Sequence, residues 1–387
     1  MRTLAVVGTG LIGTSVALAA SRRGVTVFLS DRDPVSARTA AALGAGLAEE
    51  PVAPVDLAVL AVPPSAVGTV LAAAQRRSLA RVYTDVASVK SVPVRMALRQ
   101  APDPSRFVGG HPLAGRERSG PLAARADLFL GRPWALTPAA CTSDAALGTA
   151  RELVELCGAV PVVTRSRDHD DAVALTSHVP HLVASLMAAR LREGPDGMSR
   201  FAGQGLRDVT RIAHGDSGLW GDILQANAAS IAGVVRDLHA DLSRLVTALD
   251  LLAAPDGSEP ERAERARGMR TMVDLLDRGI AGLAQLPATC GDVADARVRV
   301  AVGGRPGELR RLLDAAAEFV VAPEETVVVQ AADAWGGGAD GGLVVRFPLP
   351  SDLAECLTAG LRAGGWAAEC EQGAERGYSA ARTAGSE

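Results

Sequence analysis

Short apolar runs alternate with Ala-rich segments in the amino-terminal part of the chain. The apolar runs predict strands over residues 3–7, 25–30, 55–62 and 81–86, with helical segments such as residues 15–23 between them. Strands that alternate with helices are typical of a parallel, doubly wound α/β sheet of the Rossmann type. Ligands of such sheets bind beyond the carboxyl ends of the strands, so the side chains at these ends are the first candidates for a site.

The pattern changes near Asp168 to long Ala- and Leu-rich stretches with helical spacing. These stretches predict helices over residues 175–191, 199–214 and 219–252, and therefore an all-helical second domain. The last of them carries more apolar surface than one helical layer buries, so we expect a homodimer through this domain. A polar, charged stretch over residues 255–268 precedes one more predicted helix.

The last part of the chain returns to strands, in the ferredoxin-like order β-α-β-β-α-β. The predicted elements are a strand over residues 298–302, a helix over 307–319, strands over 326–331 and 342–347, a helix over 351–363 and a strand over 366–369. We therefore divide the chain into a nucleotide-binding domain (1–165), a helical substrate and dimerisation domain (166–290), a ferredoxin-like domain (295–375) and a disordered tail (376–387).

A glycine pattern marks the first strand-to-helix turn. Gly8, Gly10 and Gly13 follow the first apolar run with the G-x-G-x-x-G spacing of dinucleotide-binding turns. The first glycine allows the tight turn, the second lets the backbone approach a pyrophosphate, and the third permits close packing of helix on strand. The amino end of the helix also attracts phosphate charge. The predicted cofactor site further contains Leu11, Ile12, Val62 and Pro63.

The second predicted strand ends in Asp31, whose carboxylate is placed to accept hydrogen bonds from the ribose hydroxyls of adenosine. This favours NAD over NADP. The neighbouring Arg32 would tolerate a 2′-phosphate, so NADP stays an alternative. In the other interpretation, the glycines only shape a tight turn and Asp31 caps the helix that begins near Pro34.

Composition excludes several classes of protein. The chain has 387 residues, 48% hydrophobic content and a formal net charge of −4, without a basic patch, so we expect no nucleic-acid partner. No apolar run approaches the roughly 20 residues that span a bilayer, and no signal peptide precedes the first strand, which predicts a cytoplasmic protein. The five cysteines are scattered without C-x-x-C spacing, so we expect neither a metal site nor a disulfide framework.

Residues 108–120 form a glycine-rich segment that contains His111 and Glu117. A histidine that follows a sheet strand lies where ligands bind, and a neutral imidazole accepts protons near neutral pH. A His-Pro pair is also found in ordinary loops with a hydrogen-bonded ring. Both interpretations stay open at this point.

Several segments, taken together, resemble the prephenate and arogenate dehydrogenase family of tyrosine biosynthesis. They are residues 8–15, residues 84–90, the His111 segment, His169-Asp170, residues 177–181 and residues 207–213, with Trp220 and Asn227. The resemblance implies NAD-dependent oxidative decarboxylation of prephenate to 4-hydroxyphenylpyruvate. The last domain and residues 303–309 resemble an ACT regulatory domain, which implies tyrosine or phenylalanine as effector; an oligomerisation module without ligand is the alternative.

The resemblance implies catalytic roles for two residues near the strand ends. His111 accepts the hydroxyl proton as hydride leaves C4 of prephenate for NAD, and Ser88 hydrogen-bonds the same hydroxyl. In the alternative interpretations, Ser88 caps the helix near Pro93 and Lys90 is a solvated surface charge. Glu117 either contacts substrate or braces its loop.

The helical domain is expected to bind the substrate anion. Prephenate is a dianion, and Arg211 is similar to the carboxylate-binding arginine of the family. Arg207 is expected to form an ion pair with Asp208 or Asp171. The resemblance further assigns substrate contacts to His181, Ser177, His169 and Trp220.

Each of these assignments has a structural alternative. The histidines would be interior side chains, and Trp220 would be part of the helix core. Asn227 is expected to tie helices together through its amide. A zinc site of three histidines has no supporting motif, because no H-E-x-x-H or similar spacing occurs.

Other functions remain in contention. Arogenate carries an ammonium group and calls for an acidic partner, which the sequence does not assign among Asp208, Asp216 and Asp222. Related dehydrogenases would place a catalytic lysine in the helical domain, but residues 168–286 contain no lysine. A non-catalytic nucleotide-sensing protein would need the glycine pattern without needing His111.

Overall fold

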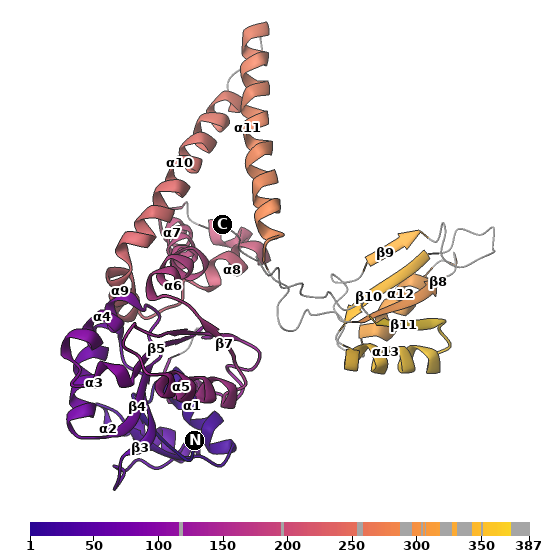
Figure 1. Ribbon diagram of the computed structural model, residues 1–387. Helices are drawn as coiled ribbons and strands as arrows, with labels where there is room; N and C mark the ends of the chain where they lie inside the picture. Colours follow the sequence, from indigo (N-terminus) through magenta and orange to yellow (C-terminus); the bar gives the residue numbers. More distant parts are fainter. Residues whose placement is uncertain are drawn as a thin grey trace, which may run out of the picture. The chain divides into compact units, whose positions relative to one another are not determined.

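The computed structural model describes residues 1–115, 119–194, 197–253, 258–286, 296–302, 305, 307–317, 327–330, 343–349 and 351–372. The chain forms two compact units, Met1–Leu275 and Leu276–Glu387, each of which is described by itself. The nucleotide-binding and helical parts share the first unit (Figure 1).

A seven-stranded sheet organises the first part of the chain, in the order β2-β1-β3-β4-β5-β6-β7. Its strands are β1 (Thr3–Val7), β2 (Thr26–Ser30), β3 (Val55–Leu60), β4 (Ala80–Asp85), β5 (Phe107–Pro112), β6 (Pro133–Thr137) and β7 (Val160–Val163). Strands β1 to β5 are parallel, as the sequence pattern predicts. Strand β6 runs antiparallel to β5, and β7 runs parallel to β6, so the sheet is mixed at this edge.

Helices cover both faces of this sheet (Figure 1). They are α1 (Leu11–Arg22), α2 (Pro34–Ala42), α3 (Val67–Arg76), α4 (Ser91–Gln100) and α5 (Asp144–Leu156), with short 3₁₀ turns η1 (Pro64–Ala66), η2 (Pro104–Arg106) and η3 (Pro121–Ala123). Asp33 caps α2 by accepting a hydrogen bond from the Val35 amide at 3.0 Å. The alternative in which Asp31 caps this helix is therefore wrong.

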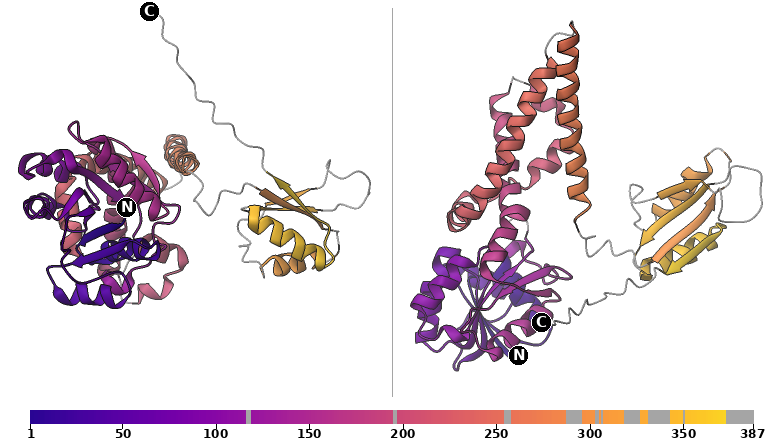
Figure 2. Two further views of the ribbon diagram at one scale, coloured as in Figure 1. Left: turned by 60° about the horizontal axis from the view of Figure 1, so that its bottom comes forward. Right: turned by 45° about the horizontal axis from the view of Figure 1, so that its top comes forward.

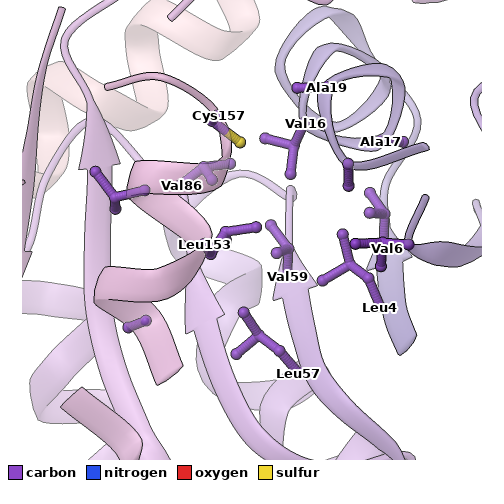
Figure 3. Close-up of a cluster of buried hydrophobic side chains, with 14 of the residues drawn as sticks. Leu4, Val6, Val16, Ala17, Ala19, Leu57, Val59, Val86, Leu153 and Cys157 are labelled. Atoms are coloured by element: carbon purple, nitrogen blue, oxygen red, sulfur yellow. The ribbon is translucent and has the colours of Figure 1, made fainter. Parts of the chain in front are cut away.

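The central strands are apolar throughout because both of their faces are buried. Successive side chains of a strand point to opposite faces. Leu57 and Val59 belong to the cluster beneath α1 and α5, where Leu153 and Cys157 also lie (Figure 3). Ala58 and Leu60 belong to a second cluster on the other face. The continuous run that predicts β3 is thus the signature of a strand with two covered faces.

The helical part follows the sheet. It contains α6 (Ser166–Val173), the π-helical turn η4 (Ala174–His178), α7 (Val179–Glu193), η5 (Met198–Phe201), α8 (Gln204–Arg211), α9 (Ser217–Ala226), α10 (Ala228–Ala253) and α11 (Glu259–Leu283). The single helix expected over residues 219–252 is interrupted at Asn227, which ends α9 with non-helical backbone angles. Most of the charged stretch 255–268 forms the first turns of α11. Its charged side chains lie on the solvated face of this helix.

One helical run, Ser166–Glu193, is long and apolar enough by length and composition to cross a membrane. The sequence reasoning overlooked it, because α6, η4 and α7 read as separate patterns. Buried ionisable side chains interrupt its apolar character, among them His169, Asp170 and His178. Within the first unit, these groups bond to one another, to His111 of β5 and to Asn227 between α9 and α10.

The long helix α10 exposes an apolar stripe. Leu238, Leu242, Val246 and Leu249 recur every three or four residues and are 38–59% exposed. Helix α11 lies beside it, joined through Arg244 to Asp274 at 3.5 Å (Figure 1). A stripe of this kind fits the homodimer that the sequence pattern predicts.

The second unit contains a four-stranded antiparallel sheet in the order β11-β8-β10-β9. Its elements are β8 (Ala296–Val302), α12 (Glu308–Ala317), β9 (Val327–Gln330), β10 (Leu343–Leu349), α13 (Ser351–Ala363) and β11 (Ala368–Gln372). Both helices pack on one face, over a core that includes Val300, Phe347 and Leu357 (Figure 2). The predicted β-α-β-β-α-β order is present. The proposed tail, 376–387, lies outside the described residues.

Candidate active site

The glycine turn has the geometry that the sequence pattern predicts. Gly8 has φ of +100°, and a Cβ there would lie 2.1 Å from the carbonyl oxygen of Ala61. A Cβ on Gly13 would lie 1.9 Å from the carbonyl oxygen of Gly8, so only glycine allows this approach of α1 to β1. Gly10 begins α1 without a side-chain cap and has open space around it. The amino end of α1 is therefore accessible to a phosphate group.

Asp31 is held at the end of β2 by the same turn. Its Oδ2 accepts hydrogen bonds from the backbone amide of Thr9 at 2.6 Å and from the Thr9 hydroxyl at 3.0 Å. Its Oδ1 accepts from the Asp33 amide at 2.9 Å. Thr9 is fully buried, so its two hydrogen bonds fix the Asp31 carboxylate. The carboxylate keeps lone pairs that can accept hydrogen bonds from a ligand. Sequence reasoning missed Thr9, since it occupies a variable position of the glycine pattern.

A cleft of about 580 Å³ opens at the carboxyl ends of the strands. It is lined by the glycine turn (Gly10, Leu11, Ile12, Gly13), the end of β3 (Ala61, Val62, Pro63, Pro64), the turn after β4 (Val86, Ala87, Ser88), Gly115, Ser119, Gly120, and the helical residues Arg211, Ile212, His214, Gly215, Asp216, Leu219 and Trp220. Of the predicted cofactor residues, Gly10, Leu11, Ile12, Gly13, Val62 and Pro63 thus share one cleft with Ser88, Arg211 and Trp220. Gly8, Asp31, Arg32 and His111 are not among the lining residues.

Ser88 lies in the turn between β4 and α4, half-buried at the cleft. The alternative in which Ser88 caps α4 is wrong, because the side chain of Asp170 performs this task. Asp170 accepts hydrogen bonds from the backbone amides of Lys90 at 2.7 Å and Ser91 at 2.8 Å. The hydroxyl of Ser88 makes no hydrogen bond to the described residues, so it is available to a ligand.

Lys90 is completely buried, which contradicts its interpretation as a solvated charge. Its ammonium group donates to Asp85 and, at 2.6 Å, to the carbonyl oxygen of Gly110. Burial lowers the pKa of Lys90, while the Asp85 carboxylate opposes this shift. Asp85 also accepts from the Gly110 amide at 3.0 Å, so the pair joins β4 to β5 directly before His111.

His111 is the penultimate residue of β5 and not a loop residue. Its ring is 9% exposed, and Nδ1 lies 2.9 Å from Nε2 of His169. His169 Nδ1 lies in turn 2.9 Å from Oδ1 of Asp170. Burial lowers the pKa of His111 well below its ordinary value of 6.5, and the nearby His169, Lys90 and His178 lower it further. His111 is therefore a neutral imidazole at neutral pH.

Asn227 connects α6 and η4 to the start of α10. Its Nδ2 donates to the Asp170 carbonyl oxygen at 2.7 Å and lies 3.2 Å from Nδ1 of His178. This confirms that its amide ties helices together. Burial lowers the pKa of His178 to about 4, and the nearby His169 adds to the shift. Nε2 of His178 has no partner within the described part of the chain.

Trp220 forms the helical wall of the cleft. It stacks on His181 with ring centroids 3.6 Å apart and planes 9° apart. A Cβ on Gly215 would lie 2.3 Å from Trp220 Nε1, so glycine makes room for the indole. The His181 ring is buried, and burial lowers its pKa. His181 therefore supports the indole of Trp220 by stacking on it.

Arg211 ends α8 and lines the cleft, as expected for an anion-binding residue. Arg207, one turn earlier, is exposed and outside the lining. Its expected ion pairs are not formed in the described structure, because Asp208 accepts from Gln204 at 2.7 Å and Asp171 accepts from Ser230 at 2.6 Å.

Three predicted substrate residues, Ser177, His169 and His181, do not line the cleft. Ser177 is exposed in η4 and does not line the cleft. His169 lies behind His111, with 3% exposure, where it contacts a protein side chain on each ring nitrogen. Glu117 lies outside the described residues. Among the described residues, no group of three or more His, Cys, Asp or Glu side chains is placed to hold a metal ion.

Fold and site together define a class. A glycine turn for a dinucleotide, a buried neutral histidine and a cleft closed by a helical part are the components of a nicotinamide-dependent dehydrogenase. Residues 16–163 match the family described as prephenate dehydrogenase, nucleotide-binding domain, and residues 165–260 match prephenate dehydrogenase, dimerization domain. The chain belongs to the prephenate dehydrogenase family.

Known relatives agree. The chain is 46% identical over 318 residues to a probable prephenate dehydrogenase of Streptomyces niveus, covering 81% of this chain and 86% of that protein. It is 33% identical to a cyclohexadienyl dehydrogenase of Zymomonas mobilis, over 66% of this chain and 89% of the relative. A crystal structure of Aquifex aeolicus prephenate dehydrogenase with hydroxyphenyl propionate and NAD⁺ matches with a TM-score of 0.61 and 26% identity, over 72% of this chain and 98% of that one.

Proposed function

We propose that this protein catalyses the NAD-dependent oxidative decarboxylation of prephenate to 4-hydroxyphenylpyruvate. The observation that carries the proposal is His111, a buried imidazole kept neutral at the carboxyl end of β5. A proton acceptor at this edge of the sheet is required when the C4 hydroxyl of prephenate becomes a carbonyl. Family membership supports the same reaction, as does the cleft that Ser88 and Arg211 share with the glycine turn.

The proton balance of the reaction gives His111 two tasks. Hydride leaves C4 for the nicotinamide of NAD while the hydroxyl proton passes to His111. The C1–carboxylate bond then breaks, and its electron pair enters the ring, which becomes aromatic with a phenolate oxygen at C4. His111 returns its proton to this oxygen. No net proton is released, so a single residue that stores and returns one proton is sufficient.

The other residues bind and orient. We propose that the amino end of α1 at Gly10 and Leu11 binds the pyrophosphate and that Asp31 binds the adenosine ribose. Arg211 would bind a substrate carboxylate, and Trp220 would lie against the ring. Ser88 would donate or accept a hydrogen bond at the C4 hydroxyl, which its position in the cleft allows.

A panel of substrates tests the proposal. NADH formation is followed with purified full-length protein, NAD or NADP, and prephenate or arogenate. We expect turnover of prephenate with NAD, and the absence of turnover with any combination would contradict the proposal. Such a result would favour the nucleotide-sensing alternative, which NAD binding without turnover would then support.

Arogenate is the second candidate substrate because Asp216 lines the cleft. Among the described residues, Asp216 accepts a hydrogen bond at Oδ1, from the Leu219 amide at 2.8 Å, and none at Oδ2, which offers a partner for an ammonium group. A crystal structure of Synechocystis arogenate dehydrogenase matches the chain with a TM-score of 0.54 and 26% identity. If arogenate is used, Asp216→Asn should raise its KM about tenfold and leave that of prephenate unchanged.

For the second unit we propose an ACT-like regulatory role, with tyrosine or phenylalanine as effector. The β-α-β-β-α-β order and antiparallel sheet support this proposal. Calorimetry on the full-length protein is expected to show binding of one of these amino acids, and a chain shortened after residue 286 should lose it. Equal signals from both chains would place the binding in the catalytic cleft. We also propose that the protein is a cytoplasmic homodimer.

A further inference from the structure

Three buried groups, none of which is among the residues that line the cleft, form a continuous chain. His111 from β5 contacts His169 through Nδ1, and His169 contacts Asp170 in α6, with 2.9 Å at each step. All three side chains are at most 9% exposed. The chain therefore lies in an interior of low dielectric, where the direction of each hydrogen bond strongly affects the next one.

Asp170 is fixed at the far end of this chain. Its Oδ1 accepts from the Lys90 amide and its Oδ2 from the Ser91 amide, so the carboxylate cannot rotate. Burial alone would raise the pKa of Asp170, but the hydrogen bonds from His169, Ser91 and Lys90 outweigh it and lower that pKa. Asp170 is thus an ionised carboxylate, which only accepts hydrogen bonds.

The ionised carboxylate determines the positions of the ring protons. Since Asp170 only accepts, Nδ1 of His169 carries a proton and donates it. In neutral His169, Nε2 then bears a lone pair and accepts, so Nδ1 of the neutral His111 must be the protonated nitrogen. Nε2 of His111 is left with a lone pair, and it makes no hydrogen bond to any described residue.

We infer that His169 and Asp170 are positioning residues that hold His111 in the tautomer whose Nε2 accepts the substrate proton. The inference rests on the proposed function and deepens it. It replaces the substrate contact predicted for His169 and gives Asp170 a role that the sequence reasoning did not assign.

The same chain stabilises the reaction. When Nε2 of His111 takes the hydroxyl proton, the ring becomes an imidazolium whose Nδ1–H bond still points to His169. The negative charge of Asp170 lies at the end of this line of hydrogen bonds and favours the cation, whereas burial and the Lys90 ammonium oppose it. When the proton returns to the phenolate oxygen, the original tautomer is restored without rotation of either ring.

Nitrogen-15 NMR of histidine rings tests the tautomer without requiring activity. Full-length protein labelled at its six histidines is studied by long-range proton–nitrogen correlation, and His111→Asn identifies the His111 signals. We expect Nδ1 of His111 to be protonated and Nε2 unprotonated at pH 7. Protonation of Nε2 instead, which a doubly protonated His169 would impose, would overturn the inference.

Kinetics of His169→Phe provide the second test. Phenylalanine fills the same space without an acceptor for His111, so both tautomers become populated. We expect kcat to fall about 10- to 100-fold, with the KM values of prephenate and NAD changed less than twofold. A kcat equal to that of the wild type, with an unchanged tautomer spectrum, would refute the role of His169.

Asp170→Asn is compared with a matched control, Asp171→Asn. Asp171 is the next carboxylate along α6, but it is exposed and bonds to Ser230. We expect kcat to fall in Asp170→Asn and to stay at the wild-type value in Asp171→Asn; equal values would count against the inference. If Asp170→Asn does not fold, because Asp170 also holds the start of α4, His169→Phe decides. Failure of wild-type turnover would contradict the proposed function alone, since the tautomer spectrum still tests the chain of bonds.

Discussion

The two walls of the cleft are built in different ways. On the strand side, His111, Lys90 and Asp170 do not line the cleft themselves but are buried, and their partners hold them in one arrangement. On the helical wall, Arg211 and His214 are exposed. Buried bonded groups are preorganised, whereas exposed side chains adapt to a ligand at the cost of ordering. The difference indicates that chemistry belongs to the strand wall and recognition to the helical wall.

The largest expected effect concerns the stability of the strand wall. Lys90→Met removes one partner of a buried pair and leaves the Asp85 carboxylate uncompensated, which should cost about 3–5 kcal/mol of unfolding free energy. Chemical denaturation measures this loss. In the control Arg165→Met, which breaks the exposed pair with Asp168, the loss should be below about 1 kcal/mol. Equal losses of unfolding free energy in the two variants would show that the buried Lys90–Asp85 pair stabilises the protein no more than an exposed pair does.

The next effect sharpens the assignment of recognition to the helical wall. Arg211→Ala removes a charged hydrogen bond to the substrate carboxylate, which should raise the KM of prephenate about 10- to 100-fold. The kcat should change much less, because the strand wall is intact. Steady-state kinetics of Arg207→Ala, one turn earlier and outside the cleft, provide the control. If Arg211→Ala lowered kcat and left the KM of prephenate unchanged, the assignment of recognition to the helical wall would be wrong.

A pH dependence of stability follows from the buried histidines. The pKa of His178 falls from 6.5 to about 4 in the folded protein, so the unfolded chain binds its proton first as the pH decreases. The contribution of His178 to the unfolding free energy should therefore be fully present above pH 6.5 and be lost as the pH decreases from about 6.5 to 4. Denaturation curves over this range measure how steeply the unfolding free energy changes with pH, and this slope should be smaller in His178→Gln. A slope unchanged in this variant would contradict the assignment to His178.

The smallest effect concerns cofactor choice. Asp31→Ser removes the carboxylate that would repel a 2′-phosphate, so the KM of NADP should fall and that of NAD should rise, each by about five- to tenfold. Initial rates with both cofactors measure the change. Asp33→Asn, a carboxylate at the same strand end that caps α2, should leave both KM values unaltered. If Asp31→Ser keeps the preference of the wild type for NAD over NADP, Asp31 does not determine the choice of cofactor.

Local patterns explain which features the sequence could predict. The glycine turn, strands β1 to β4 and the order of the second unit depend on spacing within a few residues, and the structure has them where the patterns indicate. The bonds of Asp170 to Lys90 and Ser91 join segments about 80 residues apart, so spacing alone could not reveal them. The pair His169-Asp170 within a resembling segment was the only signal for this network.

Burial also explains the wrong interpretations. A lysine is normally exposed, and only the approach of β5 to β4 encloses Lys90 with Asp85. The break between α9 and α10 escaped detection because the apolar spacing continues across Asn227, whose backbone leaves the helix while its side chain bonds to Asp170. Tertiary contacts decided both cases.

The most direct test of the account is the rate of hydride transfer in His111→Asn. Asparagine keeps a polar group of smaller size but accepts no proton at neutral pH. Rapid mixing of prephenate with the enzyme–NAD complex should show a rate about 10²- to 10⁴-fold below that of the wild type, with NAD binding unchanged. A rate within a few-fold of the wild type would contradict the assignment of His111 as the proton acceptor.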